Sequence, residues 1–196
     1  MKSIAPLAAA ACVTFGFAGM AQEKKSSTAH PVTITFYIAG VQCNSCVDSI
    51  TDAVKKVPSV TAVNGLSEAS GYALVSFDSH VSSFHQIARA IADANAVHGE
   101  PYKPTIRFRV PDYSQGETAS KVDAIFSKLA TLVTVKVLDR KAGLFEAGFL
   151  PLKVDASKNA PQGFNGGNLG HPIRDEAPKG LGLRFNFVTE ARSAAK

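Results

Sequence analysis

Tryptophan is absent from the chain of 196 residues, methionine occurs only twice and cysteine only three times. Three cysteines are too few for the disulfide framework that holds many small secreted folds together. Net charge is also low: the formal value is +5, and no run of lysine and arginine is present. Nucleic-acid binding is therefore not expected, because it depends on clustered basic residues that contact phosphates. Apolar residues make up 45% of the chain, which is enough for a packed core.

Residues 1–21 have the pattern of a secretory signal peptide. Lys2 supplies a positive start, and residues 4–20 are apolar and rich in alanine. Gly19 and Ala21 place small residues at the usual recognition positions for cleavage. The apolar run is short for a membrane-spanning helix, which needs about 20 residues. We therefore predict export to the periplasm or the medium with cleavage of this segment, and no stable membrane span in the mature chain.

Cleavage after Ala21 would change the cysteine count. Cys12 would be lost, so that only Cys43 and Cys46 remain in the mature chain. A pair three positions apart closes too small a loop to hold a whole fold together. In an exported protein the pair is therefore a metal site, a redox pair or a small local disulfide.

Residues 31–110 contain six segments with the periodicity of strands or helices. Strands are expected where apolar and polar residues alternate, and helices where apolar residues recur every three or four positions. The expected order is a strand at 32–38, a helix at 47–57, strands at 60–63 and 72–77, a helix at 84–91 and a strand at 105–110. Pro58 ends the first helix, and Ser82 or Ser83 caps the second. This βαββαβ order predicts an α+β ferredoxin-like sandwich, with two helices on one face of an antiparallel sheet.

The predicted topology decides which side chains can approach the cysteines. The first strand runs toward Cys43, and the loop at residues 95–104 lies at the same end of the sheet. This loop contains His98, Tyr102 and Lys103, which are the expected neighbours of the cysteine pair. A solvated loop histidine is the simpler interpretation of His98, and a third metal ligand or a gate is the alternative.

The other histidines of this region are expected far from the cysteines. The topology places His30, His80 and His85 at the opposite end of the sheet. His80 and His85 flank the start of a helix, and we predict that both lie at the surface.

The sequence around the cysteines resembles the heavy-metal-associated domain. The residues that carry the resemblance are Gly40, Cys43 and Cys46, in a Gly-x-x-Cys-x-x-Cys motif between a strand and a helix of a βαββαβ unit. That domain occurs in copper chaperones, in the N-terminal modules of copper-transporting P-type ATPases and in the periplasmic mercury-binding protein of mercury-resistance operons. The resemblance covers about residues 31–110. It departs from the family at Val41, where methionine is usual, and at Gln42, where threonine is common.

The chemistry of the two cysteines supports a soft-metal site independently. A cysteine at a helix N-terminus faces a partial positive charge and free N–H groups, which favour the thiolate. Thiolates select soft ions such as Cu(I), and two sulfurs satisfy Cu(I), Ag(I) or Hg(II), whereas structural zinc normally takes four ligands. We predict that Cys43 and Cys46 bind Cu(I), with Hg(II) or another soft ion as the alternative. The expected role is metal capture or transfer to a protein partner such as a transporter, and no enzyme activity is expected.

Two other interpretations of the cysteine pair stay open. Cys-x-x-Cys after a strand and at a helix start is also the arrangement of thioredoxin-like thiol–disulfide oxidoreductases. That fold normally has an aromatic residue before the first cysteine, where this chain has Gln42, and the predicted element order lacks its extra strand and helix. The remaining interpretation is a degenerate domain, or an inert disulfide formed in an oxidising compartment.

The C-terminal part of the chain contains no cysteine, and its sequence does not indicate a function. We expect linkers at residues 22–30 and 111–119, a smaller α/β domain at 120–190 and a tail at 191–196. Within this domain we predict a helix capped by Ser120, strands at 133–137, 144–154 and 181–187, and a surface loop at 156–180. The order of helix, strand, turn and strand repeats that of residues 47–77, so a diverged copy of the same half-fold is a further hypothesis.

Overall fold

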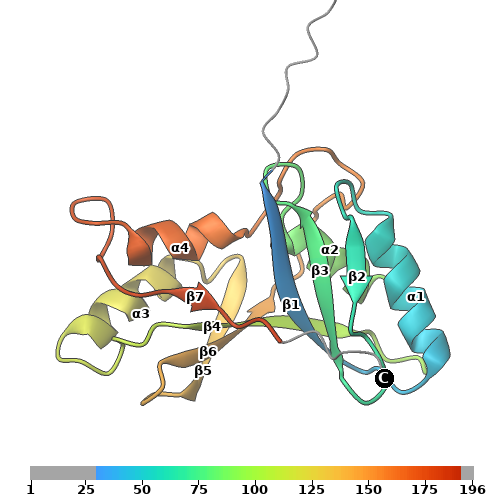
Figure 1. The fold of residues 1–196 in the computed structure, drawn as a ribbon, viewed down its shortest axis with the longest axis horizontal. Helices are drawn as coiled ribbons and strands as arrows, with labels where there is room; N and C mark the ends of the chain where they lie inside the picture. Colours follow the sequence, from blue (N-terminus) through green and yellow to red (C-terminus); the bar gives the residue numbers. More distant parts are fainter. Residues whose placement is uncertain (1–29, 191–196) are drawn as a thin grey trace, which may run out of the picture.

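A computed structural model describes residues 30–190; the predicted signal peptide, most of the first linker and the predicted tail lie outside the described residues. Its elements are arranged as Figure 1 shows: β1 (Pro31–Ala39), α1 (Asn44–Lys55), β2 (Ala62–Asn64), β3 (Tyr72–Asp78), α2 (Phe84–Ala92), β4 (Lys103–Arg109), α3 (Thr118–Lys128), β5 (Val133–Asp139), β6 (Leu144–Phe149), α4 (Gly166–Arg174) and β7 (Asn186–Phe187). No helix between residues 30 and 190 has the length and apolar character needed to cross a membrane.

The strands form one antiparallel sheet in the order β2-β3-β1-β4-β6-β5, and β7 pairs with β4. Its first four strands, with α1 and α2, have the predicted βαββαβ order, so the α+β ferredoxin-like prediction is confirmed. The register places Phe36 opposite both Ala73 of β3 and Ile106 of β4. Because strand side chains alternate between faces, these three buried residues lie on the same face of the sheet.

Helices α1 and α2 cover this buried face. Ile50 and Val54 of α1 and Ile87 and Ile91 of α2 are each four positions apart and fully buried, as expected for the apolar stripe of an amphipathic helix. Ser83 is the N-cap of α2, and its hydroxyl oxygen accepts a hydrogen bond from the Gln86 backbone N–H in a capping box.

The C-terminal part extends the same sheet. Strand β6 pairs with the free edge of β4, with Phe108 opposite Phe145 and their rings stacked 5.3 Å apart between centroids. Phe126 of α3 packs edge-on against both rings. At the C-terminal end of the described chain, the Glu190 backbone N–H donates to Thr35 Oγ1 over 3.0 Å. One sheet therefore spans both predicted domains, whose boundaries stay a prediction.

The predicted surface loop at 156–180 is wrong in part, because it contains helix α4. The helix contains three glycines and Pro172, which have low helix propensity, so the sequence does not predict it. Asn165 starts it with a capping box, since its side-chain oxygen accepts hydrogen bonds from the N–H groups of Gly167 and Asn168. Leu169 and Ile173, four positions apart, are fully buried.

Three other element boundaries differ from prediction. Helix α3 begins at Thr118 after Glu117, with no side-chain cap, so the predicted cap at Ser120 lies inside the helix. Strand β6 ends at Phe149 instead of continuing to residue 154, because Pro151 has no N–H to donate to a neighbouring strand. The last strand is only Asn186–Phe187, because the backbone N–H groups of Leu181 and Leu183 bond to carbonyls of α4 instead.

His85 is buried, not at the surface as predicted. Its Nε2–H donates to the Leu150 carbonyl oxygen over 2.9 Å, and its Nδ1 accepts from the Phe164 N–H over 3.5 Å. Both partners come from the C-terminal part of the chain. His80 is exposed as predicted, and its ring stacks on His30 with 3.8 Å between centroids.

Candidate metal centre

The chain turns sharply between β1 and the cysteines at Gly40. Its φ of +100° lies in a region that L-residues with a side chain rarely adopt. A Cβ at this position would lie 3.4 Å from Cδ1 of Tyr102. Glycine therefore allows both the turn and the close approach of Tyr102 under the cysteine loop.

Cys43 is the N-cap of α1. Its backbone is extended, and its Sγ accepts a hydrogen bond from the Cys46 backbone N–H over 3.4 Å. The sulfur thus takes the place that a serine or aspartate oxygen usually occupies at a helix start. Negative charge is favoured at this position, because the first N–H groups of a helix have no partner within it.

The two sulfurs lie 3.1 Å apart, and both cysteines are free thiols. They differ in exposure: Cys46 is fully buried under the loop, whereas Cys43 is half-buried at its rim. An incoming ion or protein thiol would therefore meet Cys43 first.

Tyr102 is the neighbour that most lowers the pKa of the buried Cys46 thiol. A hydrogen bond from its hydroxyl is the main cause that lowers the pKa of Cys46 to about 7. Burial, and then the same hydrogen bond, raises the pKa of Tyr102 to about 12. The pKa of Cys43 is raised, chiefly by its hydrogen bond with Cys46. Cys46 is therefore the more acidic of the two thiols, and the two sulfurs share a hydrogen bond over 3.1 Å.

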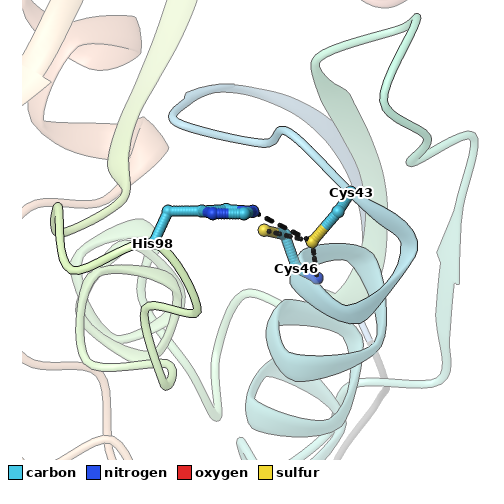
Figure 2. Close-up of side chains that lie close together, drawn as sticks. All are labelled: Cys43, Cys46 and His98. Atoms are coloured by element: carbon cyan, nitrogen blue, oxygen red, sulfur yellow. Dashed lines mark hydrogen bonds between the residues drawn. The ribbon is translucent and has the colours of Figure 1, made fainter.

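His98 lies beside the cysteines, so that three side chains of metal-ligating type come together. It lies in the loop between α2 and β4, and its Nε2 is 3.3 Å from Cys43 Sγ (Figure 2). The ligand atoms of Cys43, Cys46 and His98 all lie within 4.8 Å of one another. Among residues 30–190, this is the only group of three or more His, Cys, Asp or Glu residues close enough to hold one ion.

All three predicted neighbours lie at the cysteine end of the sheet, but only two of them contact the sulfurs. His98 and Tyr102 contact the sulfurs, and the exposed His98 ring points toward them from the loop. Lys103 lies at the start of β4 opposite Ala39. Sequence reasoning missed Ser49, whose hydroxyl donates to the Asn95 carbonyl oxygen over 2.9 Å and so ties α1 to the loop of His98. A serine on a helix surface gives no signal of such a contact.

A comparison with protein families identifies the fold of this region. Residues 35–96 match the model of the heavy-metal-associated domain. The match confirms the predicted resemblance and covers the cysteine loop, both helices and strands β2 and β3. No curated protein sequence matches the chain.

Parts of the chain are also similar to solved structures. The oxidized MerP from Ralstonia metallidurans CH34 is 27% identical and covers 38% of this chain and 97% of its own, with a TM-score of 0.33. A putative copper-ion-binding protein from Bacillus anthracis str. Ames is 26% identical and covers 39% of this chain and 99% of its own, with a TM-score of 0.34. The water-soluble region of the P-type ATPase CopA from Bacillus subtilis is 18% identical and covers 66% of this chain and 82% of its own, with a TM-score of 0.35.

Proposed function

With a heavy-metal-associated domain at residues 35–96 as the premise, we propose that this chain is an exported protein that captures a soft metal ion and passes it on. The observation that carries the proposal is the pair of free thiols, Cys43 and Cys46, with sulfurs 3.1 Å apart at the start of α1. The ion is the cargo of the protein. We propose Cu(I) as the physiological ion and Hg(II) as the alternative.

The ligand set supports a soft ion. Thiolates prefer Cu(I) and related ions, whereas oxygen ligands prefer hard cations. A tetrahedral structural zinc site needs four protein ligands. The group at the cysteines contains three candidates, and no carboxylate among the described residues belongs to it.

The difference in exposure between the sulfurs supports transfer. A partner thiolate can attack the ion from the side of the half-buried Cys43 and displace that sulfur first. Cys46, fully buried, would then release the ion in a second step. The protein in this proposal is a carrier and not an enzyme, and its partner is a metal-exchanging protein such as a transporter.

A thiol–disulfide oxidoreductase is the second candidate, because sulfurs at this separation need little movement to form a disulfide. In such enzymes the exposed cysteine attacks the substrate as a thiolate. Here the pKa of the half-buried Cys43 is raised, and the lowered pKa belongs to the buried Cys46. This distribution favours metal binding over attack on an external disulfide.

Anaerobic titration of the reduced protein with Cu(I), followed by native mass spectrometry, tests the proposal. We expect one Cu(I) per chain in the wild type and none in Cys43→Ser/Cys46→Ser. Ser45→Ala, on the same helical turn, is the matched control and should bind one ion. Failure of the wild type to bind, or equal uptake by the double serine variant, would overturn the proposal. Catalytic reduction of a small disulfide substrate would favour the oxidoreductase instead.

A further inference from the structure

The imidazole of His98 lies next to the cysteine pair. Nε2 of the exposed His98 is 3.3 Å from Cys43 Sγ, and its ring points toward the two sulfurs (Figure 2). We propose that His98 is the third ligand of the metal ion, so that the site is a three-coordinate site of two sulfurs and one nitrogen that favours Cu(I) over Hg(II). The proposal rests on the proposed function of Cys43 and Cys46.

The separation of the sulfurs leaves room for a third ligand. Two sulfurs at a metal–sulfur distance of about 2.3 Å would lie about 4.6 Å apart in a linear complex. The observed separation in the metal-free pair is 3.1 Å, so a linear complex requires the sulfurs to move apart by about 1.5 Å, whereas a bent three-coordinate ion requires less movement. A sulfur and an imidazole nitrogen can bind one ion at separations up to about 4.4 Å, given a metal–nitrogen distance of about 2.1 Å. The 3.3 Å between Cys43 Sγ and His98 Nε2 is within that limit.

The backbone holds His98 near this position before any ion binds. His98 lies in a tight turn in which the Gly99 N–H donates to the Ala96 carbonyl oxygen over 3.1 Å. Gly99 has a φ of +80°, which this turn requires and which glycine adopts without strain. A ligand held in a turn loses less conformational freedom on binding than one in an extended mobile loop.

Helix α1, which carries Cys46, also contacts the loop that carries His98. Ser49 Oγ donates to the Asn95 carbonyl oxygen over 2.9 Å. The Tyr102 hydroxyl lies 3.3 Å from the same oxygen, and its single proton serves either this oxygen or the Cys46 sulfur. Ser49 follows Cys46 by three positions on the same helix. The element that positions the buried sulfur thus also positions the loop that carries the imidazole.

The proposed ligand set discriminates between soft ions. Copper accepts imidazole together with thiolate, and Cu(I) is stable with three ligands. Hg(II) is satisfied by two thiolates in a near-linear complex, so the imidazole adds little to its binding. Zinc would still lack a fourth protein ligand among the described residues. His98 therefore contributes mainly to the affinity for copper.

The test compares three proteins in the full mature chain: wild type, His98→Gln and His80→Gln. His80 is the matched control, because it is an exposed histidine that stacks on His30 and does not belong to the cysteine group. Cu(I) affinity is measured by competition with a chromogenic chelator, and X-ray absorption of the Cu(I)-loaded proteins gives the number and type of ligands. Hg(II) affinity is measured in the same way against a competing thiol.

We expect a spectrum of two sulfurs and one nitrogen for wild type and His80→Gln, and of two sulfurs alone for His98→Gln. Cu(I) affinity should fall in His98→Gln at least as much as the about 10- to 100-fold that loss of an outer-shell partner costs. Hg(II) affinity should change less than about twofold, since the sulfurs remain. Unchanged copper coordination in His98→Gln, or an equal loss of Hg(II) affinity, would overturn the third-ligand proposal. Absence of Cu(I) uptake by the wild type would overturn the proposed function itself.

Discussion

The hydroxyl of Ser49 donates a hydrogen bond of 2.9 Å to the carbonyl oxygen of Asn95, and this contact joins the helix of the buried cysteine to the loop of His98. The two residues are 46 positions apart in the sequence. Loss of the contact should release the loop while leaving both thiols in place.

We predict that Ser49→Ala weakens Cu(I) binding by about 2- to 10-fold, the equivalent of one hydrogen bond of about 0.5–1.5 kcal/mol. Hg(II) affinity should stay unchanged, because Ser49 acts on His98 and not on the sulfurs. Competition titrations with both ions measure the effect, and Ser45→Ala on the same helix is the control. Equal losses for the two ions would show that Ser49 supports the helix rather than the position of His98.

Removal of the Tyr102 hydroxyl should make the buried thiol less acidic. Tyr102→Phe deletes the donor that lowers the pKa of Cys46, so this pKa should rise from about 7 toward its ordinary value of 9.0. Less thiolate would then be present at neutral pH. Thiolate absorbance near 240 nm, followed against pH in the metal-free reduced protein, measures the change. The Tyr72→Phe variant serves as control, and an unchanged titration of Tyr102→Phe would contradict the assignment.

A side chain at Gly40 should destabilise the turn before the cysteines. Gly40→Ala forces alanine into a φ of +100° and places a methyl group 3.4 Å from the Tyr102 ring. We expect a loss of unfolding free energy of about 1–2 kcal/mol from the backbone conformation, together with weaker Cu(I) binding. Gly116→Ala is the control, since its φ is +51° and no atom lies within 4 Å of its new Cβ. Urea denaturation should show a loss for both variants, and Cu(I) affinity should fall only in Gly40→Ala.

His85 should make the fold sensitive to mild acid. Burial lowers the pKa of His85 below its ordinary value of 6.5, so the unfolded chain binds a proton at a higher pH than the folded one. The stability that His85 contributes is therefore present above pH 6.5 and is lost as the pH falls below it, by up to about 1.4 kcal/mol per pH unit.

Urea denaturation of the metal-free protein between pH 8 and pH 5.5 measures this dependence. A His85→Gln variant should lose most of the slope, even if its stability at pH 8 is lower. His80→Gln should retain the slope, because His80 is exposed. A slope that persists in His85→Gln would assign the effect to other groups.

Local sequence patterns were sufficient to predict the metal-binding half of the fold. The alternation at 32–38 and the helical spacing after Cys43 follow directly from which side chains face the core. The topology then placed His98 and Tyr102 at the cysteine end. The distance between His98 and Cys43 was not predictable, because it depends on the turn at Gly99 and on the contact of Ser49 with Asn95.

Long-range packing explains the errors. His85 is buried by Leu150 and Phe164, which lie 65 and 79 positions away, and no local pattern reports such partners. Helix α4 has poor intrinsic helix formers, with three glycines and a proline, and is stabilised by the burial of Leu169 and Ile173. The surface prediction for His85 and the loop prediction for α4 fail for the same reason: tertiary contacts override local preference.

The pairing of β6 with β4 also moves the open edge of the sheet. A four-stranded ferredoxin-like sheet would end at β4, a seven-residue strand with unpaired backbone groups. Strand β5 is the edge here, and it carries a register irregularity between Val137 and Asp139 and an exposed Lys136. Bulges and lysines on edge strands oppose pairing with other chains. The C-terminal hairpin thus replaces a regular strand edge with one that is less suited to pairing with another chain.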